Sequence, residues 1–189
     1  MKYLLSFFLC LVLFSSNSIA QKSTALILID IQDFYFPGGK VELVDAEKAG
    51  KQAKQLLHHF RENKDLVIHV RHNFQPGGDI HDLVEPIKGE KIISKDEVNA
   101  FLNTDLNDYL RKNNIKEIVL CGMQTHMCLE GGTRAAHDLD YSCTVISDAC
   151  ATRDLKMGES LILAKDVHLS TLSTLKSYAK VLTLEEYIK

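Results

Sequence analysis

Apolar residues along this chain follow two different periods, which alternate with each other. Short apolar stretches predict strands, and they lie at 25–31, 66–70, 91–94, 118–121, 143–147 and 180–182. The stretch at 118–121 has no polar alternation, which is typical of a strand that is covered on both faces. Between the first two stretches, apolar residues from Ala46 to Phe60 recur at positions that share one face of a helix. Shorter patterns of the same kind predict helices at about 106–113, 128–139 and 166–178, and a final helical turn from Thr183.

Strands that alternate with helices predict the fold class. Consecutive parallel strands need crossover connections, so the pattern indicates an α/β three-layer sandwich with helices on both faces of the sheet. We expect a mainly parallel, roughly six-stranded sheet. Ligands of such sheets bind beyond the carboxyl ends of the strands. Reactive side chains that follow the predicted strands are therefore the candidates for a functional site.

The first twenty residues have a different character from the rest. Lys2 precedes an apolar stretch at 4–14, and small and polar residues then lead to Ser18-Ile19-Ala20. This order is typical of a secretory signal peptide, with cleavage before Gln21. The apolar stretch is short for a bilayer span, so we expect no stable membrane anchor. The prediction is a signal peptide at 1–20, one domain at 21–189, and a secreted or periplasmic protein.

Composition and charge exclude several classes of partner. Hydrophobic residues make up 46% of the chain and charged residues 25%, which argues against disorder. The formal net charge of -3 argues against nucleic acid as a partner, because phosphate binding needs a basic surface. The glycine pairs at 38–39 and 77–78 lack the Lys-Ser/Thr pattern of a phosphate loop. We expect a small-molecule substrate and no cofactor.

Three reactive side chains follow predicted strands and so share one edge of the sheet: Asp30, Lys95 and Cys128. A carboxylate that ends an apolar strand needs a partner, and Lys95 can supply the opposite charge. The pair alone is equally consistent with an ion pair that only closes a strand end. Cys128 is placed to open a helix, and the helix amides together with Lys95 would lower the pKa of its thiol. Alternatively, Cys128 is a small apolar residue that is buried in the core.

The other cysteines of the predicted mature chain have less clear roles. Cys121 and Cys143 lie within predicted strands, and Cys150 follows one and is a second candidate nucleophile. Export would permit disulfides, and a bond from Cys128 to Cys121 or Cys150 is one alternative. Four cysteines in a chain of this length do not indicate a disulfide scaffold.

Together these residues resemble the isochorismatase-like cysteine hydrolases, a family that includes nicotinamidases and N-carbamoylsarcosine amidases. The similar segments, in the family's order, are ALILIDIQ at 25–32, Lys95 with NAF at 99–101, CGMQTHMC at 121–128, TRAA at 133–136 and SDACAT at 147–152. No single segment is specific to the family. Their order and spacing are specific to it, and they extend across nearly the whole predicted mature chain.

The resemblance implies a mechanism and roles. Asp30 would be the general base, Cys128 the nucleophile, and Lys95 the cation that orients Asp30 and favours the thiolate. Backbone N–H groups of Gln124 and Cys128 would hold the oxyanion, with a cis peptide between Met123 and Gln124. Family members that cleave a vinyl ether commonly lack the cysteine, so Cys128 indicates cleavage of an amide-like C–N bond. The family often forms dimers or tetramers, so we expect a homo-oligomer.

Further residues are candidates for contacts with substrate or are equally consistent with packing. They are His126 in the cysteine-containing loop and the aromatic residues that flank the catalytic strand ends: Phe34, Tyr35, Phe36 and Phe101.

A metal is not expected. Nicotinamidases hold one through an Asp-x-His that follows the second strand; His72 matches the histidine, but Val70 stands at the aspartate position. Asp79 and His81 form a later Asp-x-His, and His69 lies nearby. The alternatives to an exported amide hydrolase are a catalytically inactive binding or scaffold protein of this fold and a metal-dependent, nicotinamidase-like enzyme.

Overall fold

The computed structural model describes residues 23–189, so the predicted signal peptide at 1–20 lies outside the described residues. Within 23–189, no helix is both long enough and apolar enough to cross a membrane.

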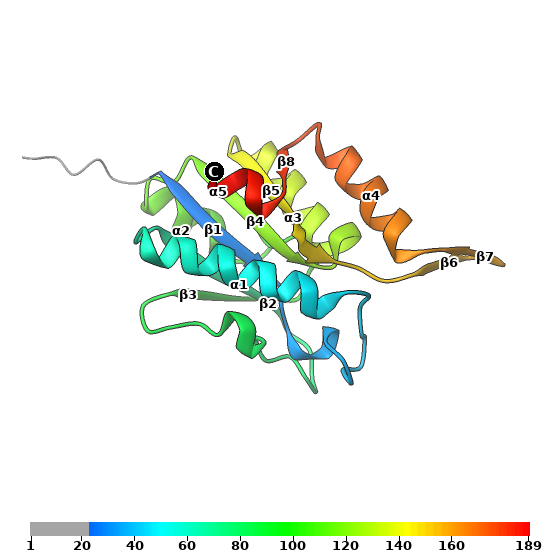
Figure 1. Cartoon of the computed structure of the whole chain (residues 1–189). Coiled ribbons are helices and arrows are strands. Elements are labelled where there is room, and N and C mark those ends of the chain that lie inside the picture. Colours follow the sequence, from blue (N-terminus) through cyan, green and yellow to red (C-terminus); the bar gives the residue numbers. More distant parts are fainter. Residues whose placement is uncertain (1–22) are drawn as a thin grey trace, which may run out of the picture.

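A six-stranded parallel sheet forms the centre of the protein (Figure 1). Its strands, in chain order, are β1 (Thr24–Ile29), β2 (Leu66–His72), β3 (Lys91–Lys95), β4 (Glu117–Met123), β5 (Ser142–Ala151) and β8 (Lys180–Leu182). They lie in the order β3-β2-β1-β4-β5-β8, and every neighbouring pair is parallel. The predicted α/β class and the six-stranded sheet are confirmed.

Helices cover both faces of this sheet (Figure 1). They are α1 (Ala46–Glu62), α2 (Leu106–Lys112), α3 (Glu130–Asp138), α4 (Ala164–Leu175) and α5 (Leu184–Ile188). The C-terminal α5 packs on α1, where the Phe60 and Tyr187 rings stack, and α3 packs on α4. The apolar face predicted from Ala46 to Phe60 is the buried face of α1. The final turn predicted at Thr183 is α5, which begins with a capping box between Thr183 and Glu186.

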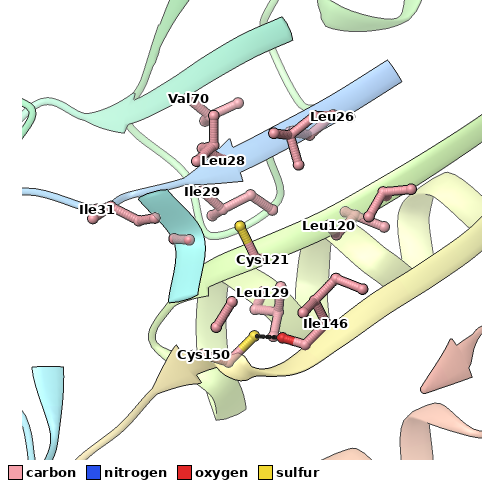
Figure 2. Packing of buried hydrophobic residues seen from close by; sticks show 14 of the residues in the cluster. Leu26, Leu28, Ile29, Ile31, Val70, Leu120, Cys121, Leu129, Ile146 and Cys150 are labelled. Carbon is pink, nitrogen blue, oxygen red and sulfur yellow. Dashed lines mark hydrogen bonds between the residues drawn. The ribbon is translucent and has the colours of Figure 1, made fainter. Parts of the chain in front are cut away.

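Two predicted boundaries are wrong in ways that affect the site. The helix predicted at 128–139 is preceded by a separate π-helical turn, Thr125–Leu129, and α3 begins only at Glu130. The strand predicted to end at 147 continues as β5 to Ala151, so Cys150 lies within a strand and not after it. Its thiol donates to the carbonyl of Ile146 at 3.2 Å within the core (Figure 2).

An antiparallel hairpin was not predicted at all. It consists of β6 (Leu155–Met157) and β7 (Ser160–Ile162) and extends away from the body between β5 and α4 (Figure 1). Most of its side chains are exposed, so no apolar alternation marks it in the sequence.

The strands β1 and β4 approach each other closely at Gly122. This glycine has φ +127°, and a Cβ atom placed on it would lie 1.9 Å from the backbone oxygen of Ile29. Ile29 is the last residue of β1, directly before Asp30. The absence of a side chain at position 122 therefore lets β4 reach the end of β1.

We expect Gly122→Ala to lower the free energy of unfolding by about 3 kcal/mol or more, because the added methyl group forces the two central strands apart. Urea denaturation measures the loss. Gly89→Ala is the matched control: it also has a positive φ, +102°, but a Cβ there meets nothing within 4 Å. The control should lose only about 1 kcal/mol, the cost of the left-handed conformation. Equal losses in the two variants would contradict the argument from close approach.

Candidate active site

Asp30 and Lys95 come from strands that are not neighbours. Asp30 directly follows β1 and has φ +50°, a conformation that turns the chain sharply at the strand end. Lys95 ends β3, and β2 lies between the two strands. The long lysine side chain therefore crosses the end of β2 to reach the carboxylate.

Asp30, Lys95 and Cys128 form one buried cluster. The Lys95 Nζ lies 2.8 Å from Asp30 Oδ2 and 3.3 Å from Cys128 Sγ, and it donates to the backbone oxygen of Glu97 at 3.0 Å. The three residues are exposed by 0%, 1% and 5%, respectively. The structure brings these three side chains together, as the sequence predicts.

The fourth neighbour of Lys95 is His72, which the sequence suggested only as a possible metal ligand. Its Nδ1 lies 3.3 Å from Lys95 Nζ. The backbone of His72 is fixed by Gln32, whose Oε1 accepts from the His72 N–H at 2.8 Å and whose Nε2 donates to the His72 carbonyl at 2.9 Å. Gln32, two residues after Asp30, is fully buried and was missed as a functional residue. It connects the end of β1 to the end of β2.

The electrostatics of the cluster differ from the expectation. Burial raises the pKa of Asp30, and Lys95 offsets part of that rise. Burial, followed by the negative charge of Asp30, raises the pKa of the Cys128 thiol to about 12, against the lowering effect of Lys95. The predicted lowering of the thiol pKa is therefore wrong, because the prediction counted the cation but not the depth of burial or the neighbouring carboxylate.

The raised pKa values have a chemical consequence. If the thiol proton left for solvent, two buried anions would share one cation. If it moves to Asp30, the cluster keeps one anion, one cation and no net charge. Transfer from Cys128 to Asp30 is therefore the deprotonation that this arrangement favours, and a carboxylate with a raised pKa is the better proton acceptor.

Residues 123–129, which we call the cysteine turn, carry Cys128 out of β4. The peptide bond between Met123 and Gln124 is cis. The Gln124 side chain is held from two sides: its Nε2 donates to Tyr35 Oη at 3.2 Å, and its Oε1 accepts from Arg153 Nε at 3.1 Å. Arg153 was missed, since nothing in its local sequence distinguishes it from a surface arginine.

The end of β5 supports the same turn. Thr125 donates through its hydroxyl to the carbonyl of Ala151 at 3.1 Å and lies 3.0 Å from His168 Nδ1 of α4. His126 is half-buried, and its Nδ1 contacts the hydroxyl of Thr152. Burial, followed by the charge of Arg153, lowers the pKa of His126. His126 thus contacts Thr152, the residue between the end of β5 and Arg153.

The predicted aromatic residues lie in different surroundings. Phe34 packs on Tyr35, the partner of Gln124, with ring centroids 4.1 Å apart. Phe36 stacks on His81 at 3.5 Å, and Phe101 lies 6.2 Å from Tyr141. These contacts connect Phe34 to the cysteine turn, and those of Phe36 and Phe101 involve other parts of the fold.

The histidines and Asp79 considered for a metal are dispersed. His69 Nε2 lies 2.9 Å from Glu90, which also binds Arg61. The Nδ1 of His81 accepts from the Leu83 N–H. Asp79 is exposed by 80%. Across residues 23–189, no three His, Cys, Asp or Glu side chains gather in a way that could hold a metal ion.

The cysteines of the described chain are all free and buried: Cys121, Cys128, Cys143 and Cys150. In this structure Cys128 therefore forms no disulfide with Cys121 or Cys150. Cys121 and Cys150 belong to the core between β1, β4 and β5 (Figure 2).

Comparisons with known proteins agree with this fold. The family model of the isochorismatase domain matches residues 24–186. The isochorismatase-family protein YddQ of Bacillus subtilis is 41% identical over 179 residues, which cover 88% of this chain and 99% of YddQ. A crystal structure assigned to the isochorismatase hydrolases, from Oleispira antarctica, superposes with a TM-score of 0.85 at 41% identity, over 88% of this chain and 96% of that one.

A structure of a cysteine hydrolase from Pseudomonas syringae pv. phaseolicola is also similar. Its TM-score is 0.84 at 25% identity, and the match covers 88% of this chain and 91% of that chain. The family model spans all six strands of the sheet and the residues of the buried cluster. The chain belongs to the isochorismatase family.

Proposed function

We propose that this protein is a cysteine hydrolase that cleaves a small amide-like C–N bond through a thioester on Cys128. The observation that carries the proposal is the buried ammonium of Lys95, which lies 2.8 Å from Asp30 Oδ2 and 3.3 Å from Cys128 Sγ. A base, a nucleophile and a cation in mutual contact are the parts that nucleophilic catalysis needs. The family membership and the similarity to a cysteine hydrolase support the same chemistry.

The first half of the reaction forms the thioester. Asp30 takes the proton of the Cys128 thiol while the sulfur attacks the carbonyl carbon of the substrate. The backbone N–H groups of Gln124 and Cys128 donate to the oxygen of the tetrahedral intermediate. Asp30 then gives its proton to the departing nitrogen, the C–N bond breaks, and the amine leaves.

The second half returns the enzyme to its starting state. A water molecule loses a proton to Asp30 and attacks the thioester carbon. The C–S bond breaks, the acid product leaves, and Asp30 returns the proton to the sulfur. Lys95 stays charged throughout and compensates whichever of Asp30 and Cys128 carries the negative charge.

The burial of the cluster points to a small substrate. Cys128 is exposed by only 5%, so the reacting carbonyl must enter a confined space, and a peptide or other large chain is disfavoured. A planar primary amide or ureido group fits this requirement better than a bulky secondary amide.

A substrate panel tests the proposal. We expect purified protein to hydrolyse at least one class of small primary amides or ureido compounds, with release of ammonia and the acid, and mass spectrometry of a rapid quench should detect acylated Cys128. Activity should be the same after treatment with a metal chelator. Turnover that is lost on chelation and restored by a metal would support the nicotinamidase-like alternative. The absence of acylation and turnover across the panel would support the inactive scaffold.

A further inference from the structure

His168 joins α4 to the cysteine turn, a contact that the mechanism above does not use. Thr125, the first residue of the π-helical turn, is fully buried, and its hydroxyl oxygen lies 3.0 Å from His168 Nδ1. The same hydroxyl donates to the backbone oxygen of Ala151 at 3.1 Å. Thr125 is therefore held from two sides, by the end of β5 and by a helix.

The hydrogen-bond pattern fixes which nitrogen of His168 carries the proton. A hydroxyl has one proton to donate, and Thr125 gives it to Ala151, because a carbonyl oxygen can only accept. Toward His168 the hydroxyl must accept, so Nδ1 carries the proton and donates. Burial lowers the pKa of His168, so the neutral ring with its proton on Nδ1 is the form present near neutral pH.

The helix that carries His168 is anchored beside the site. Asp154 Oδ1 accepts from the N–H of Ala164, the first residue of α4, at 2.7 Å, and this bond closes the base of the β6–β7 hairpin. Ala164 and Val167 are buried, and α4 packs on the π-helical turn. His168 therefore donates to Thr125 from a fixed support.

The position of Thr125 matters because its neighbours act in the reaction. Gln124 directly precedes it and supplies one of the oxyanion N–H groups of the mechanism above, and Cys128, later in the same turn, supplies the other and the sulfur. Such donors must lie about 2.7–3.1 Å from the oxyanion, and a misplacement of about 1 Å can cost on the order of a hundredfold in rate.

We propose that His168 is a positioning residue: by donating to Thr125 it sets the position of the cysteine turn, and with it the N–H groups of Gln124 and Cys128. This inference rests on the proposed hydrolase function. His168 acts through Thr125 and contacts neither the substrate nor the reacting atoms.

Two reactions of Cys128 test the proposal without knowledge of the natural substrate. Acylation by p-nitrophenyl acetate passes through an oxyanion, whereas alkylation by iodoacetamide does not, so the ratio of the two rates measures the oxyanion donors separately from the reactivity of the thiol. We expect His168→Leu, which has no donor, to lower this ratio about tenfold, a part of the hundredfold or more that the loss of one whole donor costs. His168→Asn places an amide N–H near the position of Nδ1 and should keep most of the ratio.

Variants of the partner and of a distant histidine provide the controls. Thr125→Val removes the hydroxyl at nearly constant volume and should lower the ratio at least as much as His168→Leu. Adding His168→Leu to Thr125→Val should cause little further loss, because the two residues serve one hydrogen bond. His59→Leu should leave the ratio unchanged: His59 is also half-buried on a helix and contacts Asn63, but it lies near the C-terminal end of α1, at the edge where the strands begin.

Chemical rescue separates the hydrogen bond from the bulk of the side chain. His168 borders an open cavity of about 280 Å³ between α1, β5 and α4, through which a small molecule can reach the place of the ring. Imidazole should restore part of the ratio in His168→Ala, whereas 1-methylimidazole, which has no N–H to donate, should not. Restoration by both compounds would mean that His168 only fills space, and would overturn the proposal. If neither compound restores the ratio, His168→Asn and His168→Leu decide, and equal losses in these two variants overturn it.

The positioning role and the hydrolase function fail in distinguishable ways. If wild-type Cys128 is acylated and the ratio is unchanged in His168→Leu, the hydrolase stands and the role of His168 is refuted. If iodoacetamide modifies Cys128 but neither the ester nor any compound of the substrate panel acylates it, the hydrolase function falls, and the role of His168 falls with it. Should alkylation be too slow to follow, a panel substrate gives the readout: His168→Leu should lower kcat about tenfold with KM within about twofold, and an effect on KM alone would overturn the proposal.

Discussion

Replacing Asp30 by Asn should slow turnover by roughly a hundredfold or more, the usual loss when a general base is removed, and should at the same time lower the pKa of the Cys128 thiol. The second effect follows because the charge of Asp30 is, after burial, the main cause that raises that pKa, and Lys95 remains to lower it. The variant would thus contain a more acidic thiol and yet be a poorer enzyme, since nothing is left to carry the proton to the leaving nitrogen.

The measurement is the rate of iodoacetamide alkylation at Cys128 against pH, read by peptide mass spectrometry. Cys143 is an internal control: burial alone raises its pKa to about 12, so its profile should not move in Asp30→Asn. Cys128→Ala should abolish turnover. The double variant Asp30→Asn/Cys128→Ala should lose no more activity than Cys128→Ala alone, because both residues serve one step. Full activity in Cys128→Ala, or a Cys128 profile unchanged in Asp30→Asn, would rule out the shared mechanism.

Replacing Lys95 by Met should abolish most activity and destabilise the fold. Asp30 would then be a fully buried carboxylate without its cation, and breaking a buried ion pair on one side costs about 3–5 kcal/mol. For a domain of this size the melting temperature should fall by on the order of 10 °C. The Cys128 alkylation profile should move to higher pH, because the charge that lowers the thiol pKa is gone.

The stability loss in Lys95→Met should depend on pH in a defined direction. Without Lys95, the pKa of Asp30 in the folded state rises further above its unfolded value, so the folded state holds a proton that the unfolded state releases. The penalty is therefore small below the unfolded pKa and grows as pH rises toward the folded one. The double variant Asp30→Asn/Lys95→Met should recover much of the loss, since no unpaired charge remains.

A surface ion pair made by another lysine of β3 is the control. Lys91 binds Asp105 at 2.6 Å, but the Asp105 side chain is exposed by 60%, so Lys91→Met should lose at most about 1 kcal/mol. A loss in Lys95→Met no larger than in Lys91→Met, or one that does not grow with pH, would show that Asp30 does not need Lys95 as its counter-ion.

The sequence predicts this fold well where burial imposes a period. β1 is buried along nearly its whole length, and α1 buries one regular face, so both patterns are unambiguous. The end of β5 was misjudged because Ser147 and Asp148 interrupt its apolar run. In the folded protein Asp148 has a hydrogen-bond partner, because its Oδ1 accepts from the N–H of Leu184 at the start of α5. The β6–β7 hairpin has almost no buried face, and therefore no pattern.

The candidate site was predictable only in its main members. Asp30, Lys95 and Cys128 could be placed together because the carboxyl ends of parallel strands share one edge. Gln32, His72 and Arg153 act through contacts across strands and loops that local sequence does not reveal. The direction of the pKa shift of the Cys128 thiol could not be predicted from the sequence either, because it depends on how deeply Asp30, Lys95 and Cys128 are buried.

The position of β1 in the sheet matters while the chain is being synthesised. β1 leaves the ribosome before β2, β3 and β4 and becomes one of the two central strands, paired on one side with β2 and on the other with β4. Until residues 117–123 emerge, a nascent chain with β1, β2 and β3 in place has an apolar central strand with one row of backbone groups unpaired, an arrangement that invites pairing with other chains. The same connectivity that brings Asp30 and Lys95 together early thus leaves the growing polypeptide dependent on β4 for protection against aggregation.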